Sequence, residues 1–102
     1  VLEGAHLVEH VGTANEQKFD INIDGFFLAI GHKPNSEPFR AFVETDEGGF
    51  IKTKANSQAT NVPGVFAAGD VADPVFQQAV IAAGSGSRAA LEAERYLLTL
   101  SD

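Results

Sequence analysis

The chain has 102 residues, of which 44% are hydrophobic and 21% charged, a composition typical of folded globular proteins rather than disordered ones. Its net charge of −7 disfavours non-specific binding to nucleic acids and to anionic membranes, which both require a basic surface. The absence of cysteine excludes disulfides, thiolate metal sites and thiol catalysis within this chain. No apolar run approaches the roughly 20 residues that span a bilayer. We therefore expect a cytoplasmic protein with no nucleic-acid or membrane partner.

The first 24 residues predict a β-hairpin, with strands at residues 6–11 and 18–24 and a polar turn between them. In the second strand, Phe19, Ile21 and Ile23 alternate with polar residues. This period of two predicts one buried face and one solvated face.

A possible metal motif lies in the first of these strands. The stretch from His6 through Glu9 to His10 matches His-x-x-Glu-His, the pattern of inverted zinc metalloproteases. That chemistry needs the motif on a helix, so that both histidines face one metal. The segment is rich in valine and strand-like, so we interpret the match as chance and expect no metal site.

Three short elements are predicted in the middle of the chain. Residues 26–30 are continuously apolar, which favours a strand covered on both faces. After a turn over residues 31–38, Ser36 is placed to cap a single helical turn that runs through Phe42. Residues 43–54 predict a second hairpin, with its turn at Asp-Glu-Gly-Gly.

The last element is a helix from about Pro74 or Phe76 to Leu100. One face carries residues three or four apart, most of them small, which predicts close packing against a sheet or a ligand. These residues are Ala79, Ala82, Gly86, Ala89, Ala93, Leu97 and Leu100. The charged residues near its end, including Glu92 and Arg95, are interpreted as a solvated face with a weak i,i+3 pair.

The chain is organised around residues 65–71, where small and apolar residues run into the pair Gly69-Asp70. This pattern predicts a buried strand that ends where a carboxylate faces outward. In α/β folds, ligands bind beyond the carboxyl ends of strands, and an acidic residue there commonly accepts hydrogen bonds from sugar hydroxyls. Asp is also a favoured helix N-cap, so capping of the following helix is the alternative for Asp70.

Residues 64–71 together with 77–79 and 82–86 resemble the second flavin-binding motif of the low-molecular-weight thioredoxin reductases. Residues 24–35, which include the turn Gly-His-Lys-Pro-Asn, resemble the passage from that family's NADPH domain to its FAD domain. The resemblance covers about residues 24–98, with the order and spacing of the blocks preserved. It implies FAD as cofactor and NADPH as cosubstrate.

The resemblance also implies roles for individual residues. Asp70 would hydrogen-bond the ribityl chain of FAD, beside Gly69. The helix start at Gln77, Gln78 and Ala79 would direct backbone N–H groups and the positive dipole end to the pyrimidine edge of the flavin. The glutamine side chains are equally consistent with ordinary polar residues of a first turn. None of these residues is expected to be catalytic.

The family's redox Cys-x-x-Cys pair and both of its G-x-G-x-x-G phosphate-binding turns are missing from this chain. We therefore expect the C-terminal piece of an enzyme, an expectation that the absence of methionine also favours. The predicted fold class is α/β, a partial FAD/NAD(P)-binding, Rossmann-like domain with β-hairpins, short strands and one long C-terminal helix. Residues 1–30 are assigned to the end of the NADPH domain and residues 31–102 to the C-terminal part of the FAD domain.

The implied parent is a thioredoxin-disulfide reductase that moves electrons from NADPH through FAD and a disulfide to thioredoxin. Its partners would be FAD and thioredoxin, and we expect a homodimer. One alternative is a ferredoxin-NADP reductase of the thioredoxin-reductase type. Another is a non-catalytic, self-associating interaction module, because strands and an apolar helix face made for missing parts would be exposed.

Overall fold

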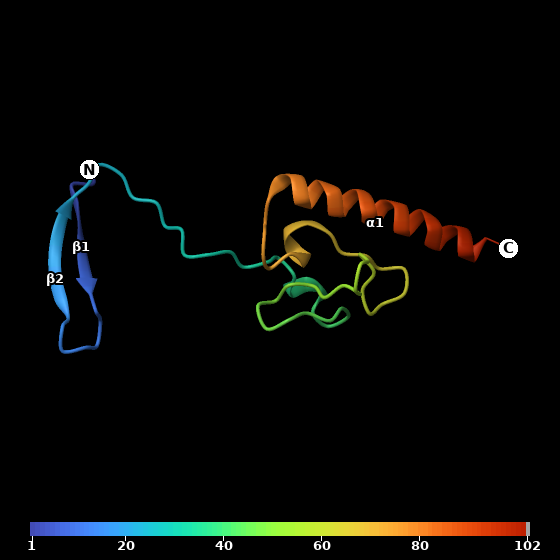
Figure 1. Cartoon of the computed structure of the whole chain (residues 1–102), viewed down its shortest axis with the longest axis horizontal. Coiled ribbons are helices and arrows are strands. Elements are labelled where there is room, and N and C mark those ends of the chain that lie inside the picture. Colours follow the sequence, from blue (N-terminus) through green and yellow to red (C-terminus); the bar gives the residue numbers. More distant parts are fainter. Residues whose placement is uncertain (102) are drawn as a thin grey trace. The chain divides into compact units, whose positions relative to one another are not determined.

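The computed structural model describes residues 1–101 and divides the chain into two units, Val1–Gly31 and His32–Asp102. The first unit contains strands β1 and β2. The second contains two short 3-10 helices, η1 and η2, and one long helix, α1 (Figure 1).

The first unit is an antiparallel hairpin of β1 (Gly4–Glu9) and β2 (Gln17–Asn22). Both predicted strands are confirmed, although each begins and ends slightly earlier than predicted. The register pairs Leu7 with Phe19 and so places the apolar side chains on one face. The prediction that this face is buried is wrong for Ile21, which is 40% exposed, because no further layer of this unit covers it in the described residues.

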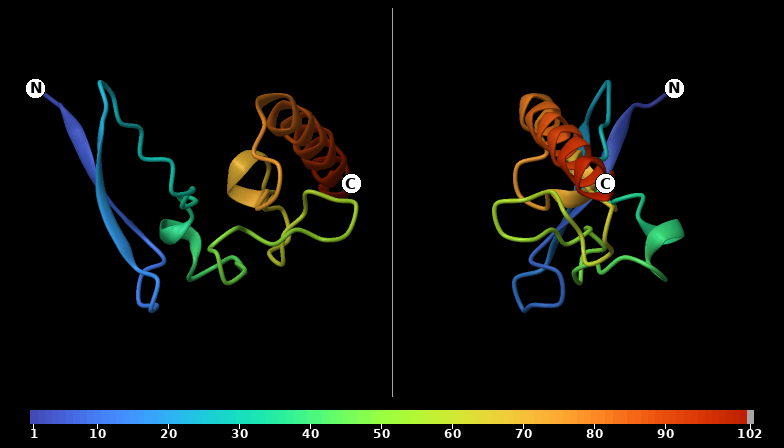
Figure 2. Two further views of the ribbon diagram at one scale, coloured as in Figure 1. Left: turned by 60° about the vertical axis from the view of Figure 1, so that its left-hand side comes forward. Right: turned by 90° about the vertical axis from the view of Figure 1, so that its right-hand side faces the viewer.

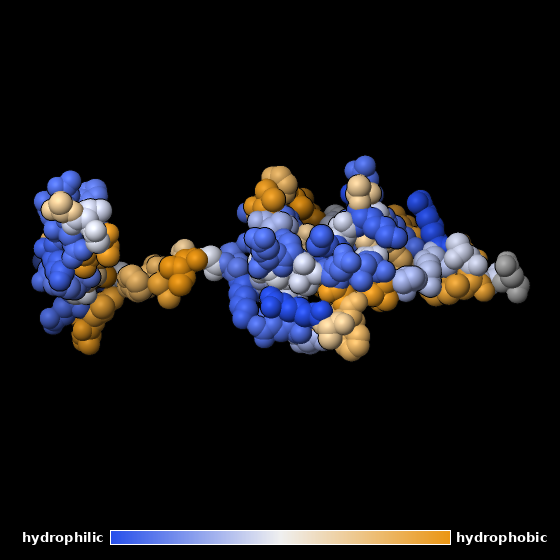
Figure 3. All heavy atoms as spheres, turned by 90° about the horizontal axis from the view of Figure 1, so that it is seen from below, coloured by the Kyte–Doolittle hydropathy of each residue, from blue (hydrophilic) through white to orange (hydrophobic). Residues whose placement is uncertain are grey.

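The apolar segment that follows the hairpin, residues 26–30, is not a strand, contrary to the prediction. Phe27 is 94% exposed and Ile30 is 85% exposed, and hydrophobic colouring marks this stretch in Figure 3. A strand needs a neighbour to receive its backbone hydrogen bonds, and within residues 1–101 none pairs with this segment.

The centre of the second unit is a small core of Val43, Ile51 and Ala67. The hairpin predicted over residues 43–54 is confirmed in outline, with one bridge, Thr45 to Ile51, and a turn closed by Gly49 N–H donating to the Asp46 carbonyl at 3.0 Å. The strand predicted over residues 65–71 is likewise reduced to one bridge, between Ala59 and Phe66. Chain segments without regular strands thus surround the core.

Helix α1 (Ala79–Leu100) lies along one side of these segments and packs against η2 (Figures 1 and 2). Its end at Leu100 agrees with the prediction. Ala82, Ala89 and Ala93 of the predicted face are half-buried, whereas Leu97 is 63% exposed. No helix within the described residues is both long and apolar enough to cross a bilayer.

Polar side chains of α1 bond to the loop of residues 56–58. The half-buried Glu92 carboxylate accepts hydrogen bonds from the Ser57 hydroxyl at 3.1 Å and the Gln58 N–H at 2.8 Å. Arg88 donates to the Asn56 carbonyl at 2.7 Å. The prediction of a simply solvated charged face is therefore wrong for Glu92, because two donors from the loop neutralise the cost of its burial.

Ser36 precedes the 3-10 helix η1 (Glu37–Phe39) and is fully buried. Its predicted role as a side-chain cap is wrong, because its hydroxyl makes no capping bond and donates instead to the Gly49 carbonyl. This bond joins the turn before η1 to the turn of the short hairpin. A buried hydroxyl needs such a partner, and here the partner is distant in the sequence.

Candidate functional site

The predicted strand end at Gly69-Asp70 is a sharp turn in the structure. Gly69 has φ of +75°, a conformation that glycine adopts without a steric penalty, and it opens the 3-10 helix η2 (Gly69–Ala72). Asp70 is exposed in the first turn of η2. The backbone thus changes direction at Gly69 and presents a carboxylate at the next residue.

Hydrogen bonds fix the chain on both sides of this turn. Before it, Gln58 and Ala67 share two hydrogen bonds. The Gln58 side chain donates to the Ala67 carbonyl at 2.8 Å, and the Ala67 N–H donates to the Gln58 carbonyl at 2.9 Å. After it, the Ile51 N–H donates to the Val71 carbonyl at 2.8 Å. The Gly69-Asp70 turn is therefore supported by the core of the unit.

The segment between η2 and α1 is folded around the Asp73 carboxylate. One oxygen accepts from the N–H groups of Val75 and Phe76, both at 2.9 Å, and the other accepts from Gln77 N–H at 3.1 Å. These backbone donors stabilise the ionised form and lower the pKa of Asp73. Gln77 itself has a positive φ of +52°.

This arrangement explains why α1 begins at Ala79 and not at Pro74 or Phe76 as predicted. The N–H groups of the intervening residues bond to Asp73, and the left-handed conformation of Gln77 interrupts any helix there. Gln78 is the N-cap residue, and its side chain makes no capping bond. The alternative that Asp70 caps α1 is therefore wrong.

The N-terminus of α1 has no acidic residue in its first turn, and the side chain of its N-cap residue, Gln78, makes no capping bond. The first four N–H groups of a helix lack intrahelical partners, and their dipole favours an anionic or electron-rich group. This end of α1 can therefore receive polar atoms of a ligand.

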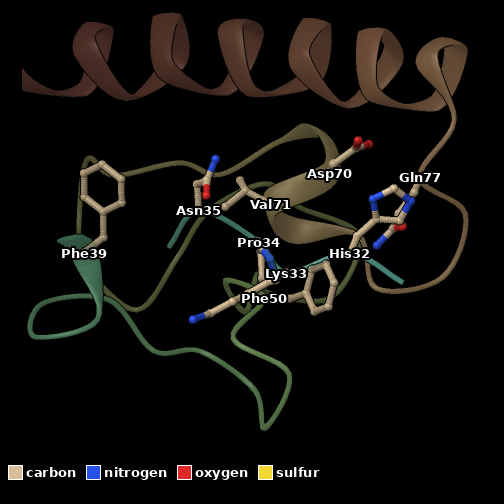
Figure 4. A pocket seen from close by; sticks show the side chains of 9 residues that line it. All are labelled: His32, Lys33, Pro34, Asn35, Phe39, Phe50, Asp70, Val71 and Gln77. Atoms are coloured by element: carbon tan, nitrogen blue, oxygen red, sulfur yellow. The ribbon is translucent and has the colours of Figure 1, made fainter. Parts of the chain in front are cut away.

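A pocket of about 450 Å³ lies at the Gly69-Asp70 turn (Figure 4). Polar side chains that can donate or accept hydrogen bonds share its wall with aromatic and aliphatic ones. The lining residues are His32, Lys33, Pro34, Asn35, Phe39, Phe50, Asp70, Val71 and Gln77. A carboxylate, an amide and apolar rings in one cavity suit a ligand that is both hydroxyl-bearing and partly planar, such as a nucleotide cofactor.

The structure brings two of the five predicted cofactor-binding residues, Asp70 and Gln77, into the wall of this pocket. Gly69, Gln78 and Ala79 are not among the lining residues and adjoin them along the chain. Within residues 1–101, no group of three or more histidine and acidic residues is placed to hold a metal ion. The strand-like reading of the His-x-x-Glu-His segment is confirmed, since it starts on β1.

Sequence reasoning missed Phe39 and Phe50 as lining residues. Neither lies in a motif, and their approach depends on the bond from Ser36 to Gly49, which joins the segments that carry them. The turn with His32 and Asn35 was singled out as a junction, and the structure shows that it also forms one wall of the pocket (Figure 4).

Helix α1 packs on η2 beside the pocket. The family and the solved structures that the chain matches identify it as part of an FAD/NAD(P)-binding, Rossmann-like domain. A family model described as pyridine nucleotide-disulphide oxidoreductase matches residues 2–86. The chain belongs to this family.

Its relatives include several thioredoxin reductases. The chain is 52% identical to the thioredoxin reductase of Coxiella burnetii over 98% of its own length, and 49% identical to thioredoxin reductase 1 of Saccharomyces cerevisiae over 86%. Among solved structures, it matches Lactococcus lactis thioredoxin reductase with a TM-score of 0.76 at 34% identity over 92% of the chain. It covers 30% of that structure's chain.

The length of the match limits what can be transferred from these relatives. The chain spans 32% of the Coxiella burnetii protein and 28% of the yeast protein. The solved structure of a thioredoxin reductase from Giardia duodenalis is also matched over only part of its length: the TM-score is 0.69 at 42% identity, and the match covers 28% of that chain. The chain thus corresponds to about a third of the length of these proteins.

Proposed function

We propose that this chain is the part of a flavin-dependent thioredoxin reductase that supplies the second half of the FAD site. The observation that carries the proposal is the pocket that joins Asp70 and Gln77 next to the uncapped N-terminus of α1. It occurs in a chain that is similar to thioredoxin reductases over nearly its whole length. In the parent protein, bound FAD would supply the transfer of electrons from NADPH toward a disulfide and thioredoxin.

The residues of the pocket fit such a cofactor chemically. The exposed Asp70 carboxylate is an acceptor for ribityl hydroxyls, and Gly69 gives it this direction. Gln78 and Ala79 form the start of α1, where the N–H groups and the dipole favour negative charge at the pyrimidine edge of the flavin, worth about 0.3–1 kcal/mol. Gln77 precedes the helix, and because its N–H is bonded to Asp73, its proposed contact with the cofactor is made from the pocket wall. None of these groups carries out a chemical step.

We propose a domain assignment that follows the division of the chain. Residues 1–30 would belong to the end of an NADPH-binding domain, and residues 31–102 would form the C-terminal part of the FAD-binding domain. The boundary of the two units at Gly31 and His32 supports this assignment. The redox cysteines and the phosphate-binding turns would then come from the remaining two thirds of the parent.

The proposed partners of the parent are FAD, NADPH and thioredoxin, in a cytoplasmic homodimer without nucleic-acid or membrane partners. Related reductases named as mitochondrial occur in Kluyveromyces lactis and Saccharomyces cerevisiae, so the compartment needs its own measurement. The names of the relatives favour thioredoxin over ferredoxin as the protein partner. A self-associating module is the second candidate, favoured by the exposed residues 26–30.

The test is FAD content in the complete protein that contains this chain. We expect the unmodified protein to purify with about one FAD per chain and an oxidised-flavin absorption spectrum, and Asp70→Ala to lose most of that flavin. Glu94→Ala, which changes an exposed carboxylate on the same unit outside the pocket, is the control and should keep it. A flavin-free unmodified protein, or an Asp70→Ala variant with normal FAD content, would contradict the proposal.

A further inference from the structure

The hydroxyl of Ser85, in the second turn of α1, contacts the turn that presents Asp70. The Gly69 N–H donates to Ser85 Oγ at 2.9 Å, and Ser85 Oγ donates to the Ala82 carbonyl, also at 2.9 Å. Ser85 is half-buried and is not among the residues that line the pocket. Ser85 is therefore placed to act on a ligand indirectly, through its bond to Gly69.

The Ser85 hydroxyl accepts one hydrogen bond and donates the other. A serine hydroxyl has one proton and two acceptor lone pairs. The Ala82 carbonyl takes the proton, and this leaves the lone pairs for the N–H of Gly69. The helix backbone thus orients the hydroxyl, and the hydroxyl orients the turn.

Gly69 needs such an external constraint. Glycine populates positive and negative φ about equally, so its own sterics do not hold the observed +75°. A Cβ built on Gly69 would lie 3.8 Å from the Ala82 Cβ, which shows how closely the turn approaches the helix. The direction of Asp70, the next residue, therefore depends on what holds the Gly69 peptide.

We infer that Ser85 is a positioning residue for the cofactor site: it holds the Gly69 peptide so that the Asp70 carboxylate faces the pocket. This inference rests on the proposed function, because the ligand that Asp70 meets is taken to be FAD. The structural part, the restraint of Gly69 by Ser85, can be measured without any ligand.

The test compares Ser85→Ala with Ser85→Thr, which keeps a hydroxyl able to bond the carbonyl one turn back. Ser87→Ala is the matched control, because Ser87 is exposed on the same helix. In the complete protein that contains this chain, the affinity of the apoprotein for FAD is measured by titration. Hydrogen exchange of the Gly69 amide is measured in the absence of FAD, by mass spectrometry with fragmentation of the peptide covering residues 66–72 so that single amides are resolved.

We expect Ser85→Ala to weaken FAD binding by about 5- to 10-fold and to speed exchange at Gly69 by a similar factor, the effect of one lost hydrogen bond. Ser85→Thr should restore both quantities, and Ser87→Ala should change neither. Unchanged Gly69 exchange in Ser85→Ala, or unchanged FAD affinity, would overturn the inference. A loss that Ser85→Thr fails to restore would also overturn it, since the hydroxyl would not be the cause.

These outcomes are separate from a failure of the proposed function. If the unmodified protein binds FAD and Asp70→Ala does not, the proposed function stands whatever Ser85→Ala does. If the unmodified protein binds no FAD, the proposed function is wrong and the role of Ser85 toward FAD is overturned with it.

Discussion

The two units of this chain differ in what holds them together. The hairpin of the first unit has the more regular secondary structure, yet nearly all of its side chains are exposed. The second unit has only single bridges in place of strands, yet it contains the buried core and the pocket. In this chain, the part that positions the site is therefore the part with buried side chains and not the part with regular strand pairing.

The same kind of hydrogen bond occurs in both units in different surroundings. In the hairpin turn, the exposed Thr13 hydroxyl donates to the His10 carbonyl at 2.7 Å. In the second unit, the Thr60 hydroxyl donates to the Val65 carbonyl at 2.9 Å, and Thr60 is only 2% exposed. Buried polar groups are costly when unpaired, so equivalent substitutions should have unequal effects in the two units.

The largest expected difference involves two glycines with similar positive φ, Gly64 at +80° and Gly12 at +75°. A Cβ on Gly64 would lie 2.9 Å from the Tyr96 ring, whereas one on Gly12 would meet nothing within 4 Å. We expect Gly64→Ala to destabilise the second unit by about 2–4 kcal/mol, since backbone strain adds to overpacking. Gly12→Ala should cost its hairpin only the strain, about 1–2 kcal/mol.

Hydrogen exchange resolved by residue would measure the opening free energy of each unit in these variants. The double variant Gly64→Ala with Tyr96→Leu is the control for the ring contact and should be less destabilised than the sum of the two single variants. Equal losses for Gly64→Ala and Gly12→Ala would show that the surroundings of the turn do not matter.

The second prediction concerns the two threonines. Thr60→Val removes an acceptor for Val62 N–H and a donor to the Val65 carbonyl in a buried place, and we expect a loss of about 1–3 kcal/mol from the second unit. In Thr13→Val, the His10 carbonyl and the Asn15 N–H lose the hydroxyl but can bond to water, so the hairpin should lose less than about 1 kcal/mol of stability. Urea unfolding followed by circular dichroism, with exchange data to separate the units, would check this. A harmless Thr60→Val would contradict the role given to buried polar bonds.

The smallest effect is a dependence on pH in the segment before α1. The pKa of Asp73 is lowered because its ionised carboxylate accepts three backbone N–H bonds. The contribution of these bonds is complete above the ordinary pKa of an aspartate, about 3.9, and is lost as pH falls through the lowered value. Exchange at Phe76 and Gln77, corrected for its intrinsic rate, should therefore rise only below about pH 4.

Asp73→Asn is the matched control, because it keeps one acceptor oxygen but does not titrate. Its corrected exchange at these two residues should be faster at neutral pH and flat across the same acid range. If both proteins open at the same pH, the change belongs to other groups.

Patterns local in sequence were predicted best. The spacing of small residues correctly placed Ala82, Ala89 and Ala93 on the packed side of α1, and the helix ends at Leu100 as predicted. The other members of the predicted face, Ala79, Gly86, Leu97 and Leu100, are exposed. The start of α1 was predicted too early, because the spacing of apolar residues does not reveal that the Asp73 carboxylate accepts hydrogen bonds from the backbone N–H groups before the helix. The strand at residues 26–30 was predicted from composition alone, which does not tell whether a partner strand is present.

Two of the residues predicted to bind a cofactor lie in the pocket wall, and their role toward a cofactor stays a prediction. Asp70 and Gln77 follow from the order of short motifs, and both line the pocket. Phe39 and Phe50 lie in segments that the buried Ser36 joins through its bond to the Gly49 carbonyl, and no local pattern encodes a bond between residues 13 positions apart. Sequence patterns therefore did not predict the contacts between segments that are distant in the sequence.

The contact between the end of α1 and the loop at Gly64 has a practical use. The Tyr96 and Phe66 rings meet edge to face, with centroids 6.2 Å apart. Tyr96 is the single tyrosine of a chain without tryptophan. Its ultraviolet absorption and fluorescence in this chain therefore report on one place, and a cooperative change of these signals during unfolding records the separation of the helix end from the loop.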